Sequence, residues 1–212
     1  MGYKLKRCLN GICAVFACLS NPLFSQQLNF QTFSFREGLS TYNISNTVQD
    51  RHGFIWIATQ DGIYRYNGSS FQVFKNKSGK EPSTLGNVFL NIAFDNKDAV
   101  YGADYMNGFD IINTTNLHIT TAGADTLGSL SVPDYWIWDI LFDNNQTTWL
   151  RGVNYFAWKK ENEKKYTVVK SIEGFPGKIT PSFIRLIGKQ HIAIGIPGLG
   201  TLIYNSQTLE KT

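Results

Sequence analysis

ISNTVQDRHGFIWIATQDGIYRYNGSSFQVF, residues 44–74, decides the fold of this 212-residue chain. It contains four short runs that favour β-strands, at 44–49, 54–58, 63–66 and 71–74. Turn signals separate the runs, namely Asp50 with Gly53, Asp61-Gly62, and Asn67-Gly68. Because these turns are too short for a crossover, the stretch predicts four antiparallel strands joined as a meander.

The same order of strands recurs along the chain. The end of the first strand is marked by Asp50, Asp95, Asp143 and Gly188, at intervals of 45, 48 and 45 residues. Four strands in 40 to 50 residues is the period of a propeller blade. The sequence therefore predicts an all-β fold, a β-propeller with four four-stranded antiparallel blades, at about 44–79, 87–121, 134–170 and 181–212.

Residues 28–33 alternate apolar and polar side chains, which predicts one more strand in front of the first blade. The fourth blade already begins its own outer strand at Thr208-Leu209, so this strand is surplus. In a propeller such a strand commonly completes the last blade and closes the ring. We therefore expect residues 26–212 to be the N-terminal part of a larger ring, and the four blades to be an open arc.

The beginning of the chain is typical of a secretory signal peptide over residues 1–25. A positive segment, Lys4 to Arg7, precedes a mostly apolar run from Cys8 to Phe24, and Ser25 offers a small residue for cleavage. An uncleaved anchor helix and lipidation of Cys18 are the alternatives. Cleavage would remove all three cysteines and lower the formal charge from +4 to +1. The exported chain would then have no disulfides. It would also have no basic face, which argues against a nucleic-acid partner.

The first repeat resembles the two-component regulator propeller repeat of periplasmic sensor regions in Bacteroidetes-type hybrid histidine kinases. The resemblance covers about one repeat, and the other three copies keep the order of strands but lose most of the signature. The matching residues are 38–40, 44, 48–50, 53–59, 61–68 and 71. The resemblance implies a sensor propeller in the periplasm or envelope of a Gram-negative bacterium, with a membrane segment and an output domain in sequence that this chain does not contain.

The ionisable residues offer little sign of catalysis or metal binding. The three histidines, His52, His118 and His191, are 66 and 73 residues apart in different kinds of element, which argues against a metal site. The aspartates at the first turn of each repeat fit turn capping better than a pair of catalytic carboxylates. The glycine-rich stretch 195–200 lacks the Lys-Ser/Thr ending of a phosphate loop and predicts a turn between strands. We expect no cofactor and no metal.

Ligand contacts are expected from the loops that join fourth to first strands and second to third strands, because both kinds of loop emerge on one face of a propeller. Exposed aromatic rings there could stack on sugars or apolar ligands. The residues expected in these loops are Tyr42, Gln60, Asp61, Tyr105, Asn107, Tyr135, Trp136 and Arg151.

Three functions are compatible with these patterns. The first is a non-catalytic extracytoplasmic module that senses a ligand, such as a glycan, for a two-component signalling protein. The second is a protein-interaction or scaffold propeller of the envelope. The third is a propeller enzyme, a lyase or hydrolase, which ranks last because the first strands offer mostly apolar, Asn and Ser positions near the ring centre. The expected partners are a carbohydrate or other small ligand, and further blades or a second copy of the chain; a membrane would be reached only through the leader or a downstream segment.

Overall fold

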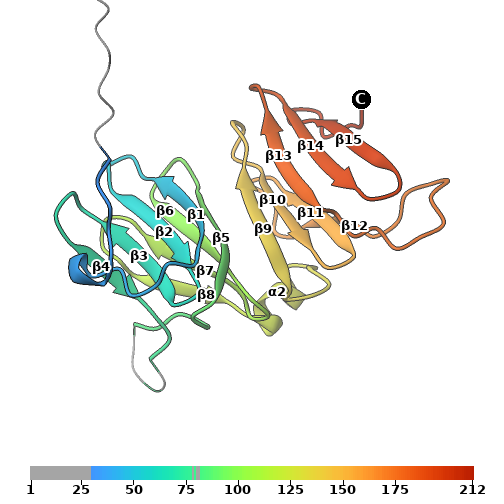
Figure 1. Cartoon of the computed structure of the whole chain (residues 1–212). Coiled ribbons are helices and arrows are strands. Elements are labelled where there is room, and N and C mark those ends of the chain that lie inside the picture. Colours follow the sequence, from blue (N-terminus) through green and yellow to red (C-terminus); the bar gives the residue numbers. More distant parts are fainter. Residues whose placement is uncertain (1–29, 78, 80–81) are drawn as a thin grey trace, which may run out of the picture. The chain divides into compact units, whose positions relative to one another are not determined.

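The computed structural model describes residues 30–77, 79 and 82–212. It divides the chain into two units, Met1–Thr32 and Phe33–Thr212, and the second holds all the described strands and helices (Figure 1). The predicted signal peptide, residues 1–25, lies outside the described residues.

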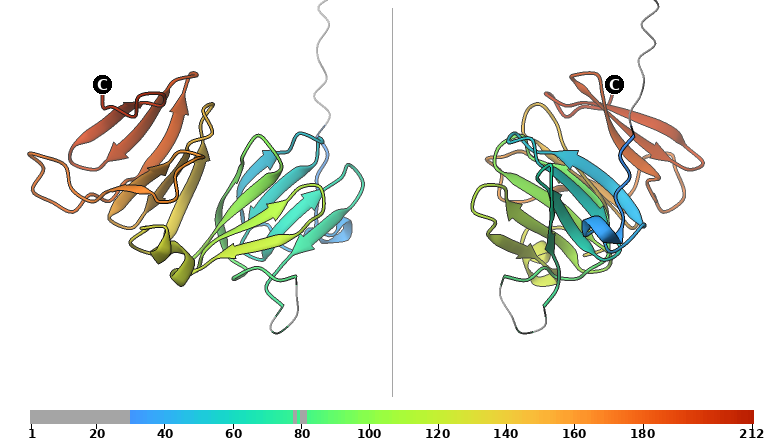
Figure 2. Two further views of the ribbon diagram at one scale, coloured as in Figure 1. Left: turned by 180° about the vertical axis from the view of Figure 1, so that it is seen from behind. Right: turned by 60° about the vertical axis from the view of Figure 1, so that its left-hand side comes forward.

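Four antiparallel sheets follow one another along the second unit, and in each the strands pair in the order of the sequence (Figures 1 and 2). The first sheet comprises β1 (Ile44–Gln49), β2 (Ile55–Thr59), β3 (Gly62–Tyr66) and β4 (Phe71–Phe74). The second comprises β5 (Phe89–Phe94), β6 (Ala99–Asp104), β7 (Gly108–Asn113) and β8 (Ile119–Ala122). The third comprises β9 (Ile137–Phe142), β10 (Thr148–Gly152), β11 (Tyr155–Lys159) and β12 (Thr167–Val169), and the fourth β13 (Phe183–Ile187), β14 (His191–Ile196) and β15 (Gly200–Asn205). The chain is an all-β propeller, as its repeats predict, and we call the sheets blades 1 to 4.

Two predicted strands differ in the structure. Blade 4 has three strands, and in place of the strand expected at Thr208-Leu209 there is an isolated bridge between Tyr204 and Lys211. Leu209 has a positive φ of 63°, a conformation that a strand does not tolerate. Of the strand expected at 28–33, residues 30–33 are irregular and residues 28–29 lie outside the described part. That the ring is larger than four blades stays a prediction.

Two short helices were not predicted. The 3₁₀ helix η1 (Phe35–Glu37) begins with a capping box, in which Ser34 and Glu37 each bind the other's backbone N–H. Helix α2 (Ala124–Ser129) lies between blades 2 and 3 and buries one side chain, Leu127. At six residues, α2 is too short to show a helical period in the sequence.

The repeated aspartate of the first turn is a structural residue. In blade 1 the carboxylate of Asp50 accepts the backbone N–H groups of His52 and Phe54 and, at 2.8 Å, the indole N–H of Trp56. Asp143 makes the same three bonds in blade 3, with Trp149 at 2.9 Å. Both tryptophans are fully buried, so the carboxylate satisfies a donor that would otherwise lack a partner. The prediction of turn capping is confirmed.

Hydrophobic cores form between successive blades. One core joins Trp56 and Ile63 of blade 1 to Phe89 and Ile112 of blade 2. A second joins blades 2 and 3, and a third packs Trp149 of blade 3 against the strands of blade 4. Each blade is therefore stabilised by burial against its neighbour, which is how stacked repeats gain stability.

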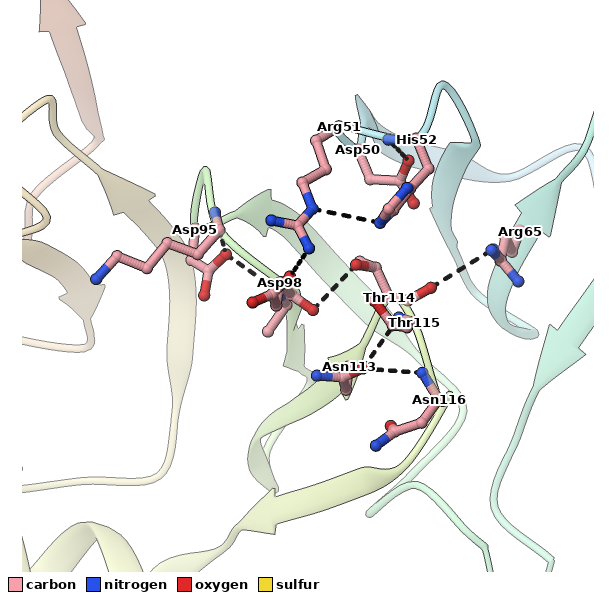
Figure 3. A network of polar contacts seen from close by, with 12 residues as sticks. Asp50, Arg51, His52, Arg65, Asp95, Asp98, Asn113, Thr114, Thr115 and Asn116 are labelled. Carbon is pink, nitrogen blue, oxygen red and sulfur yellow. Dashed lines mark hydrogen bonds and ion pairs between the residues drawn. The ribbon is translucent and has the colours of Figure 1, made fainter.

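A polar network links blades 1 and 2 where β1 turns into β2 and β5 into β6 (Figure 3). Arg51 forms an ion pair with Asp98, and Arg65 donates to the carbonyl of Thr114 at 3.4 Å. Thr114 in turn donates its backbone N–H to the carbonyl of Asp98 at 2.7 Å. The network joins loops of the two blades at the end opposite to the expected ligand face.

Candidate functional site

The loops expected to share one face do meet there. Gly62, after the β2–β3 turn, donates its backbone N–H to Asn87, which precedes β5, at 2.7 Å. Tyr105, in the β6–β7 turn, donates to Val88 at 2.7 Å. In blade 3, Val153 donates to Trp136 at 3.3 Å. Connections between blades and second-to-third turns thus lie at the same end of the first three blades.

Four of the predicted ligand residues lie on the two neighbouring loops of blades 2 and 3, and we call them the aromatic face: Tyr105, Asn107, Tyr135 and Trp136. The rings of Tyr105 and Trp136 lie 6.4 Å apart and 38° from parallel. Tyr105 is 45% exposed and Tyr135 40%. The side-chain amide of Asn107 donates to the carbonyl of Tyr105 at 3.3 Å and fixes this turn. Partly exposed rings held by backbone hydrogen bonds make a preorganised stacking surface.

The other loop residues flank the strands of blade 1: Tyr42 precedes β1, and Gln60 and Asp61 form the β2–β3 turn. Tyr42 packs edge to face on Phe35, and Gln60 accepts from Asn43 at 3.0 Å. The carboxylate of Asp61 accepts from Lys75 at 2.6 Å and also from Ser40, and these bonds, Lys75 first, lower its pKa. The acceptor that Asp61 would offer a ligand is therefore already engaged within blade 1.

Arg151 was expected in a loop, and this was wrong. It lies in strand β10, where it pairs across the sheet with Asp139 of β9. A pleated strand directs alternate side chains to opposite faces, and the side chain of Arg151 reaches a cavity instead of the loop face.

That cavity has a volume of about 690 Å³ and is lined by the first strands β1, β5, β9 and β13 (labelled in Figure 1). Its walls are rich in side-chain amides, contributed by Asn46, Gln49, Asn91, Asn96 and Asn144. Amides offer both donors and acceptors, which suits ligands that carry hydroxyl groups. The cavity is large enough for a small organic ligand.

Three charged side chains among the described residues line the cavity: Asp139, Arg151 and Arg185. Arg185 of β13 donates to Asp139 at 2.8 Å, and the Nε atom of Arg151 lies 3.6 Å from the same carboxylate oxygen. Burial raises the pKa of Asp139, and the bond from Arg185 opposes this rise. The first strands were expected to offer mostly apolar, Asn and Ser positions near the ring centre, and Asp139 of β9 and Arg185 of β13 are the charged exceptions.

A second group of ionisable residues lies beside the aromatic face. Asp104, at the end of β6, and Asp110, on β7, are both fully buried. Asn107 donates to Asp104, and the backbone N–H of Leu85 donates to Asp110 at 3.1 Å. Burial raises the pKa of Asp104 to about 6 and that of Asp110 to about 8, and the charge of Asp104 contributes to the second shift.

The histidines lie apart from both the aromatic face and the cavity. His52 accepts from its neighbour Arg51 at 3.3 Å in the β1–β2 turn. Within the part of the chain that the structure describes, no three His, Cys, Asp or Glu side chains are grouped so that they could hold a metal ion. In the same residues no helix is long and apolar enough to cross a membrane.

Comparison with known proteins gives one match in sequence and several in structure. No family model matches the chain. Histidine kinase P4 of Formosa agariphila is 33% identical over 64 residues, which cover 29% of this chain and 5% of that protein. Extracellular domains of two hybrid two-component systems of B. thetaiotaomicron are similar in structure. The first is 16% identical with a TM-score of 0.46, and the match covers 86% of this chain and 31% of that domain. The second is 18% identical with a TM-score of 0.49, and the match covers 82% of this chain and 30% of that domain. The chain thus spans less than a third of each domain and a twentieth of the kinase.

Proposed function

We propose that this chain is an extracytoplasmic propeller module that binds a small ligand, a carbohydrate or part of one, and reports it to a two-component signalling protein. The observation that carries the binding role is the pair of Tyr105 and Trp136, two rings 6.4 Å apart on adjoining loops of blades 2 and 3. Sugar rings present apolar C–H faces that pack on such aromatic surfaces. Asn107 places an amide beside the rings for the hydroxyl groups.

The signalling role is supported by sequence. The match over 64 residues is with a protein named as a histidine kinase, and the first blade carries the turn residues of the regulator propeller repeat. Because the chain spans 5% of that kinase, membrane attachment and output would belong to other sequence. The leader-like residues 1–25 support export.

The binding role is tested by isothermal titration calorimetry of the whole chain against a panel of oligosaccharides. Replacing both Tyr105 and Trp136 by alanine should weaken binding at least about tenfold, because each stacked ring contributes roughly 1 kcal/mol or more. Phe35→Ala is the matched control, since Phe35 is 58% exposed but lies in η1, ahead of blade 1 and away from the aromatic face. Equal binding by the double variant and the parent would refute the aromatic face as the ligand site.

The proposed module has no catalysis of its own. After prolonged incubation with the protein, a bound oligosaccharide should elute unchanged in size and amount on chromatography. Cleavage that is lost in an Asp139→Asn variant would instead support the enzyme alternative, because Asp139 is the one carboxylate among the described residues that line the cavity.

A further inference from the structure

One position of the repeat connects the first strands of successive blades. It lies four residues before the turn aspartate, at Asn46, Asn91 and Asp139. Asn46 donates to the carbonyl of Ile92 in the next blade at 3.3 Å, and Asn91 accepts the backbone N–H of Ile140 at 3.4 Å. Asp139 reaches the next blade through Arg185. The same site therefore holds an amide in two blades and a carboxylate in the third.

The residue that pairs with this position across the sheet also differs between blade 3 and the first two blades. Asn46 pairs with Ala58 and Asn91 with Ala103, whereas Asp139 pairs with Arg151. Blade 3 thus replaces a neutral Asn/Ala pair by a charged Asp/Arg pair at equivalent places of the sheet. Departures from a repeat pattern that concentrate in one cavity are a sign of function.

A purely structural clamp does not need these charges. Amides already join blade 1 to blade 2 and blade 2 to blade 3 at this position. Buried charges cost desolvation energy that an amide avoids, so the charged version is a poor route to stability alone. Arg151 does bind blade 4, through the carbonyl of Pro181 at 3.2 Å, but its Nε atom is buried without a hydrogen-bond acceptor.

The three charged residues of the cavity, Asp139, Arg151 and Arg185, also include N–H donors that bind no other group among the described residues. Two guanidinium groups face one carboxylate, so the charged lining of the cavity sums to one positive charge. The side chain of Arg185 is 63% exposed, and of its nitrogen atoms Nη1 makes the bonds to Asp139 and to the carbonyl of Ile184. Arg151 is held in place by Trp138, whose ring lies 5.3 Å from its guanidinium carbon. Paired guanidinium groups with free N–H donors match the geometry of an oxyanion.

We infer that the cavity binds a small ligand through an oxyanion group, the carboxylate of an acidic sugar, received by Arg151 and Arg185. The amides of the first strands then receive the ligand's hydroxyl groups. Asp139 orients both arginines and limits their excess charge. This inference rests on the proposed role in ligand binding, but it uses different residues from the aromatic face.

Isothermal titration calorimetry of the whole chain with glucuronate, glucose and inorganic sulfate tests the inference. Glucuronate should bind at least tenfold more tightly than glucose, and Arg185→Gln should weaken glucuronate at least tenfold. Arg36→Gln is the matched control, because it removes the same charge from an exposed position of η1. A second variant, Asp139→Asn with Arg151→Ala, gives blade 3 the neutral Asn/Ala pair that blades 1 and 2 have at this position. This variant should also lose glucuronate binding. Urea unfolding of each variant shows whether it is folded.

The outcomes separate the alternatives. If sulfate competes with glucuronate at similar concentrations, the oxyanion site is supported, and the natural ligand could carry either a sulfate ester or a carboxylate. If sulfate does not compete, the site is specific for a carboxylate. No binding of glucuronate or sulfate at millimolar concentrations, or equal binding by Arg185→Gln and the parent, would overturn the inference. If neutral oligosaccharides bind through Tyr105 and Trp136 but neither glucuronate nor sulfate binds, the inference is overturned while the proposed function stands.

Discussion

Raising the pH from 5 to 8 should lower the free energy of unfolding of this protein, because two buried carboxyl groups of blade 2 must ionise. Burial raises the pKa of Asp104 to about 6 and of Asp110 to about 8. In the unfolded chain both return to about 3.9. Between these values the folded state holds more protons than the unfolded state, so stability is greatest at acidic pH and is lost as the pH rises through 6 and then 8.

The magnitude follows from the two pKa values. A group that is protonated only in the folded state changes the free energy of unfolding by about 1.4 kcal/mol per pH unit. Asp104 contributes over about one pH unit above pH 5, which gives roughly 1 kcal/mol. Asp110 contributes over about three units, which gives roughly 4 kcal/mol. The expected loss between pH 5 and 8 is on the order of 5 kcal/mol, comparable to the whole stability of many domains.

Urea unfolding at pH 5, 6.5 and 8, followed by tryptophan fluorescence, measures this loss. Asp104→Asn should reduce this loss by at least about 1 kcal/mol, because Asn does not titrate and no longer raises the pKa of Asp110. Asn107 can still donate to the amide oxygen at this position. Glu173→Gln, an exposed position between blades 3 and 4, is the matched control and should leave the dependence on pH unchanged.

Two results would refute the reasoning. One is a free energy of unfolding that stays constant or increases from pH 5 to pH 8. The other is an Asp104→Asn variant that loses as much stability over this range as Glu173→Gln. The first result would mean that water or other groups satisfy the ionised forms of both carboxyl groups. The second would mean this for Asp104, whose Oδ2 atom has no hydrogen-bond partner among the described residues.

Two further predictions concern the blades themselves, and urea unfolding at constant pH checks both. Asp143→Ala should destabilise the protein by about 3 kcal/mol, because two backbone N–H groups and the buried indole of Trp149 lose a charged acceptor. Asp95→Ala removes the acceptor of two backbone N–H groups and of no indole, so it should destabilise the protein clearly less. Equal losses of stability in the two variants would contradict the role of the indole bond. Gly108→Ala should cost more than about 2 kcal/mol, since Gly108 has a φ of 108° and an added Cβ would lie 2.1 Å from the carbonyl oxygen of Ala122. Gly128→Ala in α2 meets no atom within 4 Å and should stabilise the protein by about 0.5 kcal/mol, so a loss at Gly128 as large as that at Gly108 would contradict the steric argument.

The blades could be predicted from sequence because their turns are made by near neighbours. Asp50 captures the backbone N–H groups two and four residues ahead and the indole six residues ahead, so the signal lies within seven residues. Alternation of side chains along each strand supplies the rest. The same local reasoning failed at Thr208-Leu209, where the residues suit a strand but Leu209 adopts a positive φ.

The candidate sites could be predicted only in part. Loop position and residue type were enough to place Tyr105 and Trp136 on one face, because the order of strands in a blade fixes which loops are neighbours. Asp139 and Arg185 were missed because they are 46 residues apart and each occupies an ordinary strand position. One signal was present in the repeat, since Asp139 stands where the first two blades have asparagine.

The sequence by itself determined the meander, its period and the turn chemistry, because hydrogen bonds within a few residues decide these features. Only the tertiary structure decided that Arg151 and Arg185 face one carboxylate across a cavity and that Asp104 and Asp110 are buried together. The reason is that charge interactions depend on distance and burial in space, and these are set by the register of strands and the packing of one blade on the next.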